Sequence, residues 1–252
     1  MYSVTQRAKQ VLQPRGGYVP ARSMAFNRGS GEVLDLAFEN ISPALVGMAV
    51  DYGFRVARGS SPRHAFAISL VGAEMIRKSD VAEDLLAKVS GLDDESIVSI
   101  CRLAGFDVVR RAGASKYRPV HEIKPDEATT EQIRTMVNRT LAFFEVNGPV
   151  IRDGLFFHGG YTETVSSGDG DLLTSDAIWD VKVSNAKPTK NHALQLLIYY
   201  LLSQNTVYDD DYLSISRIGI YNPRLDASWS IRIEEIPKDV IATVSREVVG
   251  YE

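Results

Sequence analysis

The sequence predicts an α/β protein in which a mostly helical N-terminal part packs on a C-terminal core of mixed β-sheet flanked by helices. Residues 33–148 carry helical periodicity, with capping residues at the starts of segments and glycines at several ends. After Pro149 short runs rich in β-branched and aromatic residues replace that pattern. These strand-like runs are interrupted by two helical segments, an order typical of a mixed sheet with helices beside it.

Composition limits the class of protein. The 252 residues are 44% hydrophobic and 24% charged, with a net charge of −4, which is typical of a globular chain and argues against a coating of nucleic acid. The single cysteine excludes an internal disulfide and favours the cytoplasm. No run approaches the roughly 20 apolar residues of a membrane span, and we expect no signal peptide and no membrane contact.

The N-terminal elements follow from local signals. Residues 1–32 are rich in Gly, Pro, Arg and Ser and are expected to form a loosely structured lead-in. Ser-Pro pairs at 42–43 and 61–62 predict helix starts, and capped helices are expected over 79–91 and 93–105. Residues 106–122 predict a short basic hairpin, and 126–147 a long amphipathic helix. No linker divides this part, residues 33–148, from the core at 149–252, so we expect one compact unit.

The C-terminal elements alternate. Strand runs occur at "PVIRDGLFF", "GYTETVSS", "DLLTS" and "AIWDVKV". "KNHALQLLIYYLLSQ" is too long for a strand and predicts a helix. "YLSISRIGIYN" and "SWSIRIEEI" predict two more strands, and "PKDVIATVSREVVG" a closing helix.

The run "AIWDVKV" places charge in an apolar strand. Alternation puts Asp180 and Lys182 on one face, about 6.6 Å apart along the strand. A short hairpin would bring Asp171 beside Asp180, and two close carboxylates favour a hard cation such as Mg²⁺ or Mn²⁺ between them. The carbonyl of Val181 is a further candidate ligand, and Lys182 would stabilise negative charge there. The alternative is a solvated surface pair worth about 0–1 kcal/mol.

The helix that follows carries a polar stripe. In "NHALQLLIYYLLSQ", His192, Gln195, Tyr199 and Ser203 recur every three or four residues and so share one face. A helix that is otherwise apolar is expected to be buried, and its polar face must meet polar partners. These partners are either the charges of the preceding strand or simply one another.

Together these residues resemble a known family. Asp171, the Asp180-Val181-Lys182 strand and the Gln195/Tyr199 helix are similar to the core of the PD-(D/E)XK nuclease superfamily, nearest to the nuclease domains of bacterial recombination helicase–nucleases. The resemblance covers residues 168–199. It implies a restriction-endonuclease-like sheet, Mg²⁺ or Mn²⁺ bound by the carboxylates, hydrolysis assisted by the lysine, and a Gln/Tyr helix that lines the site and faces DNA.

The upstream part of the family's pattern differs in this chain. The family pattern has Gly-x-x-x-His on an early helix, whereas "GMAVD" places Asp51 where the histidine would stand, four residues after Gly47. Asp51 is therefore either a metal ligand or a helix-surface aspartate. The other acidic candidates for this ligand are Glu39, Glu74 and Glu163. Asp169 and Asp176 are expected to shape turns instead.

A polyanionic substrate requires positive charge near the site. Lys187 and Lys190 precede the Gln/Tyr helix, and Arg224 in "YNPR" either contacts phosphate or stabilises a turn. A second basic group surrounds Tyr117 and consists of Arg110, Arg111, Lys116 and Arg118. DNA is the expected partner, and RNA is not excluded. Because no base-reading motif is present, no sequence preference is predicted.

The sequence thus predicts a Mg²⁺- or Mn²⁺-dependent deoxyribonuclease of phage or bacterial type. The alternative is a catalytically inactive nuclease-fold protein that binds nucleic acid or another protein in a phage or defence system. A homo-oligomer is compatible with either function.

Overall fold

A mixed six-stranded sheet organises the C-terminal half of the chain. The computed structural model describes residues 1–207 and 210–252. The strand order is β2-β8-β7-β6-β5-β3, with β6 and β7 parallel and all other neighbours antiparallel. The strands are β2 (Ala25–Arg28), β3 (Arg152–Leu155), β5 (Gly170–Leu173), β6 (Ala177–Val181), β7 (Arg217–Asn222) and β8 (Ala227–Arg232).

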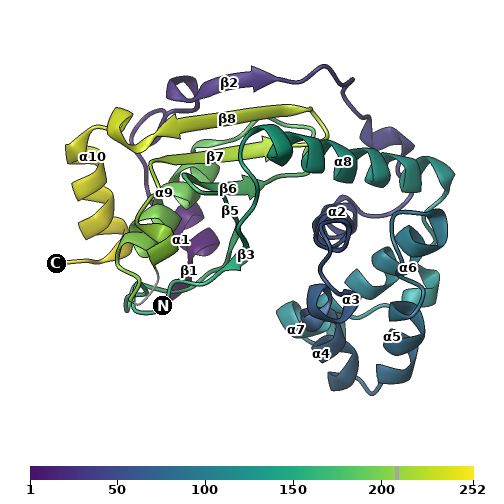
Figure 1. Ribbon diagram of the computed structural model, residues 1–252. Coiled ribbons are helices and arrows are strands. Elements are labelled where there is room, and N and C mark those ends of the chain that lie inside the picture. The colour runs from purple at the N-terminus through teal and green to yellow at the C-terminus, as the bar shows by residue number, and fades with distance from the viewer. Residues whose placement is uncertain (208–209) are drawn as a thin grey trace.

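The parallel pair requires a crossover, and helix α9 (Lys190–Gln204) supplies it between β6 and β7. Helices α1 (Val4–Gln10) and α10 (Lys238–Thr243) lie on the same side of the sheet as α9, and α10 continues as a π-helical turn over Val244–Val249 (Figure 1). A second, two-stranded sheet joins β1 (Tyr2–Ser3) in parallel to β4 (Val165–Ser167).

The other side of the sheet carries the helical part (Figure 1). The expected long helix is confirmed as α8, capped by the Asp126 carboxylate, which accepts from the Thr129 N–H. Ser42 caps α2 in the same way, with Pro43 at its first position. The helices are α2 (Pro43–Ala57), α3 (Pro62–Ala65), α4 (Ala67–Met75), α5 (Ser79–Leu86), α6 (Asp94–Ala104), α7 (Asp107–Ala112) and α8 (Glu127–Val146). Short 3₁₀ turns cover Ala21–Ser23, Leu36–Phe38, Ala114–Lys116, Val120–Glu122, Asp210–Tyr212 and Ile233–Glu235.

Strand β6 separates two hydrophobic cores. Trp179 belongs to the core formed with α2, α6 and α8, whereas Ile178 belongs to the core formed with α9. The Trp179 ring meets Phe143 of α8 edge-on at 5.0 Å between centroids, and Gly219 on β7 leaves the space for it. Adjacent residues of β6 thus enter different cores, which confirms the alternation predicted for this strand.

Two ion pairs attach the helical part to the edge of the sheet. The Asp153 carboxylate on β3 accepts from Arg55 at 3.2 Å and from Arg58 at 3.3 Å, both on or next to α2. Arg58 also donates to the Val150 carbonyl at 2.6 Å. These contacts hold α2 next to the strands that carry the candidate site.

Two sequence predictions are wrong in detail. Residues 1–32 are not a loose lead-in, because they form β1, α1 and the edge strand β2, which pairs with β8. Residues 106–122 form α7 and two 3₁₀ turns instead of a hairpin, since the apolar Val109 and Val120 are buried on helical turns. The helix start predicted at Ser61–Pro62 is confirmed by α3, which ends at Ala65 before α4 begins at Ala67.

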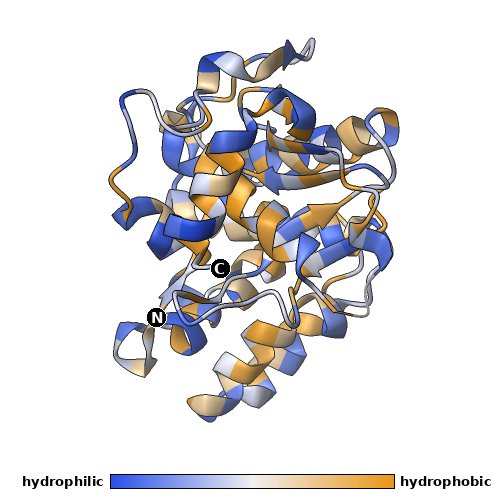
Figure 2. Cartoon of the chain, turned by 90° about the vertical axis from the view of Figure 1, so that its left-hand side faces the viewer, coloured by the Kyte–Doolittle hydropathy of each residue, from blue (hydrophilic) through white to orange (hydrophobic). Residues whose placement is uncertain are grey.

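The hydropathy pattern agrees with these layers. From the side of α9 and α10, hydrophobic segments lie in the middle of the view, and a further hydrophobic helix lies at the lower edge of the molecule (Figure 2). Among the residues that the structure describes, no helix combines the length and hydrophobicity that crossing a bilayer requires.

Candidate active site

Asp171, Asp180 and Lys182 lie together where β5 and β6 run side by side. The Lys182 Nζ donates to Asp180 Oδ1 at 2.8 Å, across the two-residue period that places both on one face. The Asp171 Oδ2 accepts from the Val181 N–H at 2.8 Å. A backbone donor at the end of β6 thus fixes one carboxylate beside the other.

Asp180 is a buried carboxylate with one oxygen unsatisfied. Only 1% of the residue is exposed, and Oδ1 accepts from Lys182 and, at 3.4 Å, from Gln195 Nε2. Oδ2 is buried and has no hydrogen-bond partner within the described part of the chain. Burying a carboxylate oxygen without a partner is costly, so Oδ2 is the oxygen of Asp180 that is free to accept a water or a ligand.

Asp171 experiences the charge of its neighbour. Burial, and then repulsion from Asp180, raise the pKa of Asp171 to about 7, although Lys182 and the Val181 N–H act in the opposite direction. A proton or a cation between the two carboxylates relieves this repulsion. The pair is therefore suited to a hard divalent ion, which prefers oxygen ligands.

Lys182 stays positively charged. Burial alone would lower the pKa of its ammonium, but the carboxylates of Asp180 and Asp171 outweigh burial and raise that pKa. The side chain therefore acts as a cation and hydrogen-bond donor at neutral pH, and not as a base.

Helix α9 contacts the Asp180 carboxylate through a hydrogen bond from Gln195. The Gln195 Nε2 donates to Tyr199 Oη at 3.1 Å as well as to Asp180, and both side chains are buried. Burial and the charge of Asp180 raise the pKa of Tyr199, so its phenol stays neutral. His192 and Ser203 have other contacts: His192 Nδ1 accepts from the Thr189 N–H at 3.3 Å, and Ser203 donates to the Tyr200 carbonyl.

A cavity of about 330 Å³ opens between β6 and α2, and we call it the acidic cavity. Asp171, Lys182 and Asp51 line it. The Asp51 carboxylate accepts from Arg55 Nε at 3.1 Å, so this arginine competes with any cation for it. Among the upstream acids proposed from sequence, Asp51 is the one that lines the acidic cavity.

The acidic cavity also contains a carboxylate that sequence reasoning missed. Asp107, 1% exposed, accepts from Tyr52 Oη at 2.6 Å and from Ser69 Oγ at 2.5 Å, and Arg111 lies 3.5 Å from it. The one local signal was the Asp107/Arg111 spacing of four, which is typical of a helix. With three donors around it, Asp107 is satisfied and holds α7 against α2 and α4.

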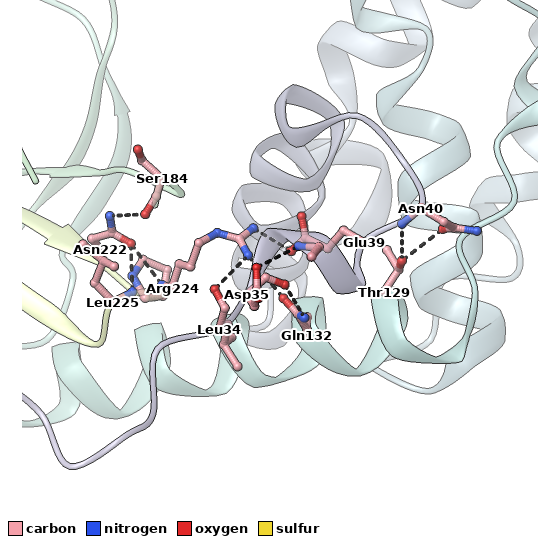
Figure 3. Close-up of polar contacts among 12 residues, drawn as sticks. Leu34, Asp35, Glu39, Asn40, Thr129, Gln132, Ser184, Asn222, Arg224 and Leu225 are labelled. Carbon is pink, nitrogen blue, oxygen red and sulfur yellow. Dashed lines mark hydrogen bonds and ion pairs between the residues drawn. The ribbon is translucent and has the colours of Figure 1, made fainter. Parts of the chain in front are cut away.

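Arg224 does not reach the surface. It is 1% exposed and forms a buried ion pair at 2.6 Å with Glu39 (Figure 3). Its guanidinium also donates to Gln132 Oε1 at 3.2 Å. The prediction that Arg224 contacts phosphate is therefore wrong. Glu39, its partner, is not among the residues that line the acidic cavity. The pair ties the turn after β7 to the segment before α2 and to α8.

The remaining acidic candidates lie away from the acidic cavity. Glu74 is exposed on α4, and Glu163 is exposed in the loop before β4. Asp169 is exposed next to Gly168. Asp176 forms a 3.1 Å ion pair with Arg217 at the β5–β6 turn, in agreement with a role in the hairpin tip.

The basic residues divide into separate groups. Lys187 and Lys190 are exposed, Lys187 in the segment that leads into α9 and Lys190 at its first position. Tyr117 stacks on Phe106 with 5.7 Å between centroids, so it belongs to the core and not to a nucleic-acid surface. Lys116 and Arg118 line a different cavity beside α2, whereas Arg110 is exposed and Arg111 borders the acidic cavity.

Within residues 1–207 and 210–252, no group of three or more His, Cys, Asp or Glu side chains is arranged to hold a metal ion. The metal ligands predicted from the sequence are the Asp171/Asp180 pair, the Val181 carbonyl and Asp51. No protein-family model, curated protein or solved structure matches the chain.

Proposed function

We propose that the protein is a Mg²⁺- or Mn²⁺-dependent nuclease that hydrolyses DNA phosphodiester bonds. The observation that carries this proposal is the Asp171/Asp180 carboxylate pair with the Lys182 ammonium 2.8 Å from Asp180. Hydrolysis of a phosphodiester requires neutralisation of its negative charge and an activated water. A carboxylate pair beside a fixed cation supplies the groups for both requirements.

The donor set fits a hard divalent ion. The unpartnered Oδ2 of Asp180 and the carboxylate of Asp171, whose pKa is raised by burial and repulsion, are the oxygens that would hold it. Such an ion, when bound, supplies Lewis-acid polarisation of a phosphoryl oxygen and lowers the pKa of a water. Asp51 is the further carboxylate that could join from α2.

The chain's own residues then have distinct tasks. Lys182, kept protonated by its carboxylate neighbours, donates to a phosphoryl oxygen and stabilises the charge that develops on it. Gln195 and Tyr199 are positioning residues, since Gln195 holds Asp180 Oδ1 and Tyr199 anchors Gln195. Their buried hydrogen bonds keep the carboxylate in one orientation.

The resemblance of residues 168–199 to the PD-(D/E)XK superfamily supports the same function, and a restriction-endonuclease-like core is compatible with the parallel β6-α9-β7 unit. DNA is the proposed partner, with RNA as a second substrate to test. The lone, buried Cys101 fits a protein of the cytoplasm.

A second function has an observation in its favour. Asp51, the further acid beside Asp171 in the acidic cavity, is already paired with Arg55 at 3.1 Å, and this is also compatible with a nuclease fold that binds nucleic acid without cutting it. That protein would act as a binding or interaction module.

One assay separates the two functions. Purified protein is incubated with linear DNA, circular DNA and RNA in Mn²⁺, Mg²⁺ or EDTA, beside Asp180→Asn and Lys182→Met. Lys238→Met, at an exposed position on α10, is the matched control for loss of a lysine. Thermal unfolding of each variant verifies that it is folded.

We expect metal-dependent cleavage by the wild type and by the Lys238 variant, and a loss of at least about 100-fold in both site variants, in the range found when a transition-state donor is removed. Cleavage that persists in folded Asp180→Asn and Lys182→Met would overturn the site. Absence of cleavage by the wild type together with retention of DNA would establish the binding module instead.

A further inference from the structure

A second cavity, of about 380 Å³, opens on the other side of Lys182 from the acidic cavity. It lies between α1 and the start of α9, and we call it the donor cavity. Lys182 lines both cavities, so the two adjoin the same ammonium group. The residues of the donor cavity that matter here are Lys9, Lys182, Asn191, His192 and Gln195.

The two cavities differ in charge. Three carboxylates, those of Asp51, Asp107 and Asp171, line the acidic cavity together with two cations, Lys182 and Arg111. No acidic side chain lines the donor cavity among the residues that the structure describes, whereas two lysines do. An acidic cavity favours a cation and a cavity lined by lysines and amides favours an anion, so the charges of the two sides are complementary to a metal and to a phosphate.

The polar groups of the donor cavity are oriented as donors. His192 Nδ1 accepts from the Thr189 N–H, which places the proton of a neutral ring on Nε2. Burial, and then the charge of Lys182, lower the pKa of His192, so the neutral ring is the stable form. Asn191 Oδ1 accepts from Gln13 Nε2 at 2.8 Å, which leaves the Asn191 Nδ2–H₂ group as a donor.

The supporting contacts are built into the fold. Gln13 is 6% exposed, and its Oε1 accepts from the Tyr18 N–H, so the segment after α1 holds Asn191 in place. Lys9 comes from α1, which packs on α9, and it forms no ion pair with the residues that the structure describes. Three donors from two elements thus face a single cavity that no acid of the described chain lines.

We propose that Lys9, Asn191 and His192 form a phosphate subsite that binds a second phosphate of the nucleic acid, next to the phosphate held at Lys182. The proposal rests on the proposed function for the identity of the substrate. Either a backbone phosphate or the phosphate at a strand end presents the required chemistry. The subsite would set the position of the strand relative to the scissile bond, and Lys182 would contact both phosphates.

The test is binding in EDTA, which requires neither metal nor cleavage. Full-length wild type, Lys9→Gln, His192→Asn and Lys238→Gln are titrated with inorganic phosphate, and with one short oligonucleotide carrying either a 5′-phosphate or a 5′-hydroxyl. Asparagine at position 192 retains an acceptor for the Thr189 N–H but removes the Nε2–H donor. Lys238→Gln removes an equal charge far along the chain, on α10.

We expect Lys9→Gln and His192→Asn each to weaken phosphate binding roughly fivefold to tenfold, and Lys238→Gln to leave it unchanged. For the oligonucleotide, Lys9→Gln should also reduce the slope of log affinity against log salt by about 0.7, a change that loss of packing would not cause. A preference for the 5′-phosphorylated strand assigns the subsite to a strand end, and equal affinity assigns it to a backbone phosphate.

Unchanged phosphate and oligonucleotide affinity in both folded variants would overturn the subsite, even if the wild type cleaves DNA. Conversely, weakened binding in both variants supports the subsite even if no cleavage is found with Mg²⁺ or Mn²⁺. The outcome for the subsite is therefore independent of the outcome for catalysis.

Discussion

Replacement of Asp171 by asparagine tests whether the carboxylate pair is held together at a cost to stability. The amide introduced at this position would keep an oxygen to accept the Val181 N–H but would carry no charge to repel Asp180. Because the pKa of Asp171 is raised in the folded chain, ionisation of this group opposes folding. The substitution Asp171→Asn should therefore stabilise the metal-free protein while removing a proposed metal ligand.

The magnitude follows from the pKa. A rise from 3.8 to about 7 corresponds to at most about 4 kcal/mol, since each pKa unit is worth about 1.36 kcal/mol. The Asp171 side chain is partly open to the acidic cavity, and solvent screening reduces this value. We expect a gain of about 1–2 kcal/mol in the free energy of unfolding at about pH 8.

The sign of the pH dependence is also determined. A carboxyl whose pKa is higher in the folded than in the unfolded state destabilises the fold progressively as the pH rises from about 4 to about 7, and has no effect below both values. The advantage of Asp171→Asn over the wild type should therefore be small at about pH 4 and largest above about pH 7.

The assay is urea unfolding followed by tryptophan fluorescence, because Trp179 and Trp229 are both buried. It is run at several pH values in EDTA and repeated with Mn²⁺. At ten times its dissociation constant, Mn²⁺ should stabilise the wild type by about 1.4 kcal/mol and the variant much less. Asp169→Asn makes the same chemical change at an exposed position and is the control.

Two results would refute the reasoning. If Asp171→Asn is less stable than the wild type in EDTA at high pH, the carboxylates do not repel each other as inferred. If Mn²⁺ stabilises both proteins equally, Asp171 is not a ligand.

Other substitutions test the fold around the site. Arg224→Met leaves Glu39 buried without its partner and should lower the free energy of unfolding by about 3–5 kcal/mol. Adding Glu39→Leu should restore the lost stability, and urea unfolding of the single and double variants measures both effects. Trp179→Phe should cost much less than the roughly 3–5 kcal/mol expected for Trp179→Ala, because the indole N–H has no partner to lose among the described residues; the two unfolding midpoints decide. Gly219→Ala places a Cβ 2.4 Å from the Trp179 ring and should lower the melting temperature, whereas no change would show that the ring can move aside.

Local patterns predicted the local features of the site correctly. Alternation along 177–183 placed Asp180 and Lys182 on one face because strand side chains alternate with a period of two. The three- and four-residue spacing of Gln195 and Tyr199 placed both on one helix face, where they bond to each other. The hairpin that brings Asp171 beside Asp180 is equally local, since a short turn joins β5 and β6.

Contacts between distant segments were not readable in the same way. Arg224 looked as suited to phosphate as to a turn, because its partner Glu39 stands 185 positions earlier in the chain. The strand at Ala25–Arg28 was missed since a four-residue exposed run has no hydrophobic pattern of its own and is ordered by pairing with β8. The donor cavity likewise combines Lys9 with His192, which no sequence spacing connects.

The sequence by itself therefore determined the order of the elements after Pro149 and the charged face of β6, because these depend on backbone periodicity and capping within a few residues. The tertiary structure alone decided which charges are buried in pairs, which acid reaches the cavity beside Asp171, and which side of Lys182 is rich in donors. Those properties depend on desolvation and on Coulomb interactions between groups that only folding brings within a few ångströms of one another.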